Sequence, residues 1–173
     1  ELQCNFNTSG ETVIDPECME WLLSNVKEPK HRTGFDRNFW IWEKAIDGCN
    51  YLLTADVSRG DGKDSSTLHV IKLETMEIVA EYQGKPTLDV YADMLNSIGR
   101  EFNNGMIVVE NNSVGFAVLT KLQELGYNNI YFSIKSTHEY VEQLQGENMS
   151  NAIAGFSTTS KTRPLIISKL ETY

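Results

Sequence analysis

Residues 51–57 read Tyr-Leu-Leu-Thr-Ala-Asp-Val, an apolar run that ends near a carboxylate, and a glycine-rich stretch follows from Ser58 to Lys63. A short apolar run bounded by a turn is typical of a buried strand. Two further β-rich segments, 67–73 and 77–82, are separated by three residues, which is short enough for a hairpin. The three segments therefore predict an antiparallel meander.

The chain beyond this meander alternates between helix and strand. Apolar side chains between residues 87 and 102 recur at the three- and four-residue spacing of an amphipathic helix. The predicted elements are helix 87–102, strand 106–109, helix 114–125, strand 130–132 and helix 160–173, the last capped by Ser160 or Thr162. Residues 133–159 have no clear period and are expected to form a long loop or a small hairpin. The order predicts an α/β fold with a mixed five-stranded sheet flanked by helices.

Residues 1–50 are expected to be a largely irregular linker segment, so that the organised domain spans residues 51–173. One short helix is predicted between Asp15 and Val26, where Asp15 can cap and proline follows it. The aromatic residues Phe39, Trp40 and Trp42 are interpreted as core residues rather than as a platform for stacking bases.

Composition limits the possible functions. The 173 residues fit one domain, and 24 acidic against 15 basic residues give a net charge of −9, which disfavours tight nucleic-acid binding by charge alone. The cysteines Cys4, Cys18 and Cys49 lack the spacing of a zinc site and indicate reduced thiols. No apolar run approaches the ~20 residues of a membrane helix, so no membrane partner is expected.

Two carboxylates end predicted strands. Asp56 ends the first strand, and Glu110 ends the fourth. If these strands are neighbours, both carboxylates emerge at one edge of the sheet, where a divalent cation would relieve their repulsion; oxygen ligands suit Mg²⁺ or Mn²⁺. Asp64 is a candidate third ligand, whereas Asp61 is better explained by a hydrophilic turn. Each carboxylate alone could be a turn or solvated residue, and only the pair indicates a metal site.

The glycine-rich loop does not match two familiar motifs. A Walker phosphate loop would need glycine at Val57 and serine or threonine at Asp64, and an EF-hand would need glutamate at Thr67. Basic residues around the carboxylates could instead hold the phosphates of DNA, although each could also be a solvated surface charge. These candidates are Arg59, Lys63, Lys161 and Arg163.

Three segments resemble the nuclease domain of the large terminase subunit of tailed bacteriophages, closest to the contractile-tailed type. They are Thr-Ala-Asp-Val-Ser-Arg-Gly-Asp-Gly-Lys-Asp-Ser-Ser-Thr at 54–67, Val-Val-Glu-Asn-Asn-Ser-Val-Gly at 108–115, and Lys-Thr-Arg-Pro-Leu-Ile-Ile-Ser-Lys-Leu-Glu-Thr-Tyr at 161–173. The opening Cys-Asn-Phe-Asn-Thr-Ser-Gly at 4–10 resembles the segment that leaves the packaging ATPase domain of that family.

The resemblance implies an RNase H-like fold and a two-metal endonuclease that cuts concatemeric viral DNA, with Asp56 bridging two Mg²⁺ or Mn²⁺ ions and Glu110 binding one. It also implies a parent protein in the host cytoplasm that works with a portal protein and a small terminase subunit on double-stranded DNA. The third acidic residue of the family lies beyond the Arg-Pro-Leu-Ile segment. We therefore expect the domain at residues 51–173 to be truncated at its C-terminus and the nuclease activity of the fragment to be impaired.

Two other classes stay open from the sequence. A Holliday-junction resolvase or an integrase-like nuclease would share the first carboxylates, although not the loop sequence around them. A non-catalytic module that grips DNA or docks on the portal would need no metal. Metal titration separates the catalytic classes from the binding module, and cleavage of linear duplex against four-way junctions separates the two kinds of nuclease.

Overall fold

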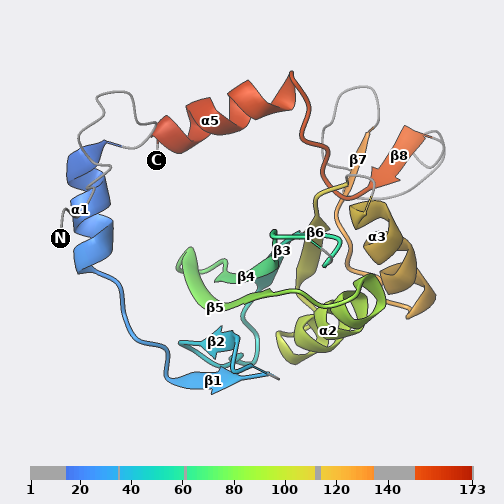
Figure 1. Ribbon diagram of the computed structural model, residues 1–173, viewed down its shortest axis with the longest axis horizontal. Helices are drawn as coiled ribbons and strands as arrows, with labels where there is room; N and C mark the ends of the chain where they lie inside the picture. The colour runs from blue at the N-terminus through green and yellow to red at the C-terminus, as the bar shows by residue number, and fades with distance from the viewer. Residues whose placement is uncertain (1–14, 35, 61, 112–113, 135–150, 173) are drawn as a thin grey trace. The chain divides into compact units, whose positions relative to one another are not determined.

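The computed structural model describes residues 15–34, 36–60, 62–111, 114–134 and 151–172 (Figure 1). The chain divides into two compact units, one formed by residues 29–158 and the other by residues 1–28 together with 159–173. The predicted boundary between a linker segment and a nuclease domain at residue 50 stays a prediction.

The larger unit contains a mixed six-stranded sheet in the order β1-β2-β5-β4-β3-β6. Its strands are β1 (His31–Thr33), β2 (Phe39–Ile41), β3 (Tyr51–Asp56), β4 (Ser66–Lys72), β5 (Glu77–Gly84) and β6 (Met106–Val109). Strands β3, β4 and β5 form the predicted antiparallel meander, and β6 runs parallel to β3. The predicted mixed α/β sheet flanked by helices is therefore confirmed.

The predicted count of five strands is wrong. Strands β1 and β2 come from residues expected to be irregular, and β2 pairs with β5 through Phe39 and Tyr82. Each of these two strands has three residues, too few for a period to be visible in the sequence. Phe39 is buried, as expected for a core residue, whereas Trp40 and Trp42 are only half-buried.

The predicted strand 130–132 does not join the main sheet as a full strand. Ile130 makes a single parallel bridge with Ile107 of β6. The chain then forms β7 (Phe132–Ile134), which pairs antiparallel with β8 (Ala152–Ala154) in a separate two-stranded sheet. This pairing agrees with the expected hairpin in 133–159, although residues 135–150 lie outside the described part of the chain.

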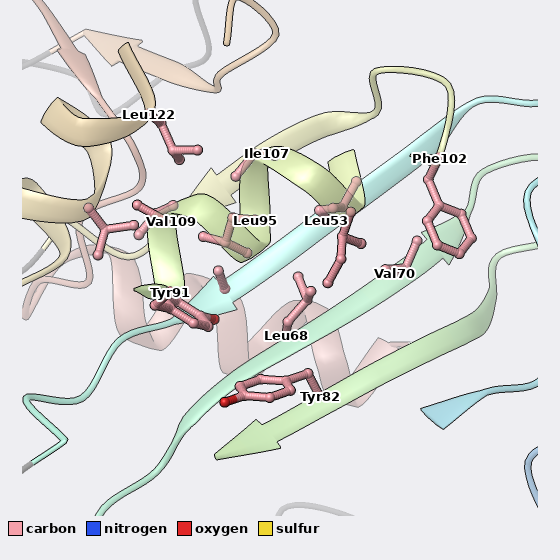
Figure 2. Close-up of a cluster of buried hydrophobic side chains, with 14 of the residues drawn as sticks. Leu53, Leu68, Val70, Tyr82, Tyr91, Leu95, Phe102, Ile107, Val109 and Leu122 are labelled. Atoms are coloured by element: carbon pink, nitrogen blue, oxygen red, sulfur yellow. The ribbon is translucent and has the colours of Figure 1, made fainter. Parts of the chain in front are cut away.

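Helices α2 (Leu88–Glu101) and α3 (Gly115–Glu124) pack on one face of the sheet, where they share one apolar core with it (Figures 1 and 2). Leu53 of β3, Leu95 of α2 and Leu122 of α3 are all almost fully buried in this core. Because side chains alternate along a strand, the burial of Leu53 and Ala55 turns Asp56 toward the opposite face.

The smaller unit contains α1 (Pro16–Ser24) and α5 (Thr162–Thr172). The Asp15 side chain accepts a hydrogen bond of 2.8 Å from the Glu17 N–H, which confirms the predicted cap of α1. The expected cap of α5 was Ser160 or Thr162, whereas the Thr159 hydroxyl accepts from the Thr162 N–H at 3.1 Å. None of the helices in the described residues has the length and apolar character needed to span a membrane.

Candidate metal centre

The structure brings the Asp56 and Glu110 carboxylates together at one edge of the main sheet. Asp56 is the last residue of β3, and Glu110 directly follows β6. The two strands are neighbours and parallel, with Ala55 opposite Val109, and the Glu110 N–H donates to the Ala55 carbonyl oxygen at 3.1 Å. Parallel neighbours end at the same edge, so the two acidic side chains emerge side by side.

The electrostatics of Asp56 show the cost of this placement. Partial burial of its carboxyl group raises the pKa of Asp56, and the nearby Glu110 carboxylate raises it further, both by its charge and by a side-chain hydrogen bond. The charge of Asp64 also raises this pKa, while a hydrogen bond from the Val57 main chain lowers it. The ionised pair is thus unfavourable by itself, and a divalent cation would remove the repulsion.

The loop after Asp56 is fixed at several points. The Ser58 N–H donates to the hydroxyl of buried Ser66 at 3.0 Å, and the Lys85 ammonium donates to the Gly62 carbonyl oxygen at 2.9 Å. Gly60 has φ +77°, and a Cβ there would lie 2.8 Å from the Pro86 carbonyl oxygen, so glycine is required. The loop is therefore held against the start of the segment that leads into α2.

A hollow of about 370 Å³ lies between this loop and the start of α3. It is lined by Asp56, by the loop residues 57–60, 62, 64 and 65, and by Val114. Two of the candidate residues from the sequence, Asp64 and Arg59, therefore share a wall with Asp56. Oxygen donors with uncompensated negative charge are the ligands that Mg²⁺ and Mn²⁺ prefer, so the residues present fit such an ion.

The remaining candidates lie in different places. Lys63 is exposed in the loop but does not line the hollow, and Asp61 lies outside the described residues. Lys161 and Arg163 are exposed near the start of α5, in the smaller unit, so the basic strip of four residues stays a prediction. Within the described ranges, the potential ligands do not form a cluster of three or more.

Tyr91 lies on the apolar side of α2 among the core side chains (Figure 2), and the structure places its hydroxyl against the main chain of Asp56 and Thr67. Its buried hydroxyl donates to the Thr67 carbonyl oxygen at 2.5 Å and lies 3.5 Å from the Asp56 carbonyl oxygen. Thr67 is the register partner of Asp56 in the β3–β4 pair. Tyr91 thus ties α2 to the strand end that carries the carboxylate, a contact that the sequence does not signal.

Comparison with models of protein families finds no match, and comparison with curated proteins finds none either. Among solved structures, the large terminase nuclease of thermophilic phage G20c with bound magnesium matches with a TM-score of 0.59 and 17% identity, covering 85% of this chain and 64% of that one. The same nuclease with bound zinc matches with a TM-score of 0.57 and 18% identity, covering 85% and 70%.

A third structure of the G20c nuclease, with bound cobalt, matches with a TM-score of 0.59 at 17% identity, over 85% of this chain and 63% of that one. The chain thus spans about 64% of the length of the magnesium-bound nuclease. At these identities the likeness concerns the fold, and it agrees with the mixed sheet, the flanking helices and the resemblance drawn from the sequence. The chain has the RNase H-like fold of the phage large terminase nucleases.

Proposed function

We propose that this chain is the metal-dependent DNA endonuclease domain of a phage large terminase. The observation that carries the proposal is the pairing of Asp56 and Glu110 at the ends of two adjacent parallel strands, beside a hollow that also contains Asp64 and Arg59. The fold shared with a nuclease solved with bound magnesium, cobalt and zinc supports the same reading.

Each residue of the site has a defined part in this proposal. Asp56 and Glu110 would hold the metal, and Asp64 would add negative charge on the wall of the hollow. Two divalent cations bound there would supply a Lewis acid that activates water and stabilises the leaving 3′-oxygen at the phosphorus. Arg59 offers a guanidinium group beside Asp56, suited to contact a phosphate next to the bond that is cut.

The proposed substrate is concatemeric double-stranded viral DNA. A domain from a chain of net charge −9 should bind duplex weakly by itself. In the parent protein, a packaging motor would raise the local concentration of DNA, and such tethering increases apparent affinity by about 10²–10⁴-fold. The portal protein, the small terminase subunit, the host cytoplasm and the contractile-tailed type belong to this proposal as features of the parent protein.

The test is metal-dependent cleavage of linear duplex DNA by the chain and by a version extended at its C-terminus. We expect the extended version to cleave with Mn²⁺ or Mg²⁺, and we expect this cleavage to be lost in EDTA and in its Asp56→Asn and Glu110→Gln variants. Asp93→Asn is the matched control, because Asp93 is an exposed carboxylate on α2 and outside the hollow.

Other outcomes would assign a different function. Preferential cleavage of four-way junctions would support a resolvase instead. DNA binding without metal binding or cleavage in the extended version would support a module that only grips DNA. Full activity of Asp56→Asn would show that the acidic pair is not the active site.

A further inference from the structure

Residues 154–156, which we call the clasp, lie along the end of β6. Phe156 pairs in parallel with Glu110. The Phe156 N–H donates to the Val109 carbonyl oxygen at 2.9 Å, and the Asn111 N–H donates to the Phe156 carbonyl oxygen at 2.7 Å. The Glu110 N–H meanwhile donates to Ala55 of β3. The main chain around Glu110 is therefore held from both sides, by β3 and by the clasp.

One side chain adds to this arrangement. The Asn111 amide nitrogen donates to the Ala154 carbonyl oxygen at 2.7 Å, and the residue is half-buried. With its own main-chain N–H bonded to Phe156, Asn111 makes two hydrogen bonds to the clasp. The residue that directly follows Glu110 is thus fixed by both its backbone and its side chain.

The clasp is itself anchored and closely fitted. The Gly155 N–H donates to the Tyr131 carbonyl oxygen at 2.7 Å, and the hydroxyl of buried Ser133 donates to the Gly155 carbonyl oxygen at 3.3 Å. Gly155 has φ +82°, and a Cβ there would lie 2.6 Å from the Val109 carbonyl oxygen. A side chain at this position would separate the clasp from β6, so the close approach depends on glycine.

We propose that Asn111 is a positioning residue for the metal centre: by binding the clasp, it holds Glu110 at the separation from Asp56 that a shared cation requires. The inference rests on the proposed function, because it assumes that the two carboxylates bind metal. A strand end held on one side only can fray, and a carboxylate displaced by a fraction of an ångström no longer shares an ion with its neighbour. Groups that orient metal ligands in this way commonly affect metal affinity strongly.

The test compares Asn111→Ala with Asn129→Ala. Asn129 is the matched control because its side-chain nitrogen also donates to a main-chain oxygen, the Asn104 carbonyl oxygen, at 2.8 Å. Neither Asn129 nor Asn104 is part of the candidate metal centre. Titration of the metal-free protein with Mn²⁺ alone, by calorimetry, gives the affinity. We expect Asn111→Ala to raise the dissociation constant about tenfold and Asn129→Ala to leave it unchanged.

Amide hydrogen exchange without metal provides a second measurement. The Glu110 N–H, which is bonded to Ala55, should exchange faster in Asn111→Ala than in the unaltered protein, and at the same rate in Asn129→Ala. Unchanged Mn²⁺ affinity in Asn111→Ala, with the unaltered protein binding Mn²⁺, would overturn the positioning role. If the unaltered protein binds no Mn²⁺, the proposed function fails. Faster exchange of the Glu110 N–H in Asn111→Ala would then show that the clasp stabilises the fold alone.

Discussion

Replacing Tyr91 with phenylalanine removes the hydroxyl that contacts the main chain of Asp56 and Thr67, and it leaves the ring. Tyr91 is fully buried between α2 and the sheet, and its ring lies 6.1 Å from that of Tyr82. Phenylalanine keeps this apolar packing. What is lost is the hydroxyl that donates to Thr67 at 2.5 Å and lies 3.5 Å from the Asp56 carbonyl oxygen.

The loss of stability follows from this single hydrogen bond. Burial raises the pKa of Tyr91 far above its usual value, so the hydroxyl is a neutral donor at any working pH. Leaving a buried acceptor without its donor costs about 1–3 kcal/mol. For a chain of this size, about 1 kcal/mol corresponds to a shift of about 2–4 °C in Tm. Tyr91→Phe should therefore lower the Tm by about 2–12 °C.

Tyr127→Phe is the matched control, because Tyr127 is buried and its hydroxyl donates to the Gly105 carbonyl oxygen at 2.6 Å. Thermal unfolding in EDTA should show similar losses for both variants. Only Tyr91→Phe should also weaken Mn²⁺ binding. The loss should be smaller than the about tenfold loss typical of groups bonded directly to a metal ligand, because the Tyr91 hydroxyl contacts only the main chain of Asp56. A Tyr91→Phe protein with unchanged Tm would refute the role of this hydroxyl.

Three further changes have defined outcomes. At pH 7 in EDTA, Asp56→Asn should raise the free energy of unfolding slightly, by about 0.2–1 kcal/mol as for exposed charge pairs. Because the folded-state pKa of Asp56 is raised, this gain should shrink as the pH falls toward 3.8; a gain independent of pH would contradict the charge argument. Gly155→Ala should lower the free energy of unfolding in urea by at least about 1–2 kcal/mol, because Gly155 has a positive φ and lies close to Val109. An unchanged free energy of unfolding would show that the clasp can move. Charge reversal of Lys161 and Arg163 together should lower DNA cleavage by a C-terminally extended protein with Mn²⁺ binding intact, whereas unchanged cleavage would make them solvated surface charges.

The sequence predicted the elements that carry a strong period. The alternation and length of β3, β4 and β5 and the apolar stripes of α2 and α3 are local signals, and their bounds lie within two residues of the expected ones. The proximity of Asp56 and Glu110 was also predictable, because each is the carboxylate that ends an apolar run. After β4 and β5 the chain returns through α2 to β6, which runs parallel beside β3, so both strands end at one edge of the sheet.

The rest depended on pairings between distant residues. Strands of three residues, such as β1 and β2, have too few positions to show alternation. The clasp joins residues more than 40 positions apart, as in the Asn111 bond to Ala154, and nothing in the local sequence marks that pairing. Gly155 was visible as a glycine, although its positive φ and its approach to Val109 appear only in the folded chain.

Mn²⁺ calorimetry on the unaltered protein and on Asp56→Asn tests the central claim, that Asp56 and Glu110 share a divalent cation. We expect the unaltered protein to bind Mn²⁺ measurably, and Asp56→Asn to bind it more weakly, because a neutral amide supplies less charge to a hard cation than a carboxylate does. The Mn²⁺ affinity of Asp56→Asn should be at least about tenfold lower with the fold retained, and that of Asp93→Asn should be unchanged. Equal Mn²⁺ affinity in the unaltered protein and in Asp56→Asn would show that Asp56 and Glu110 do not share a divalent cation.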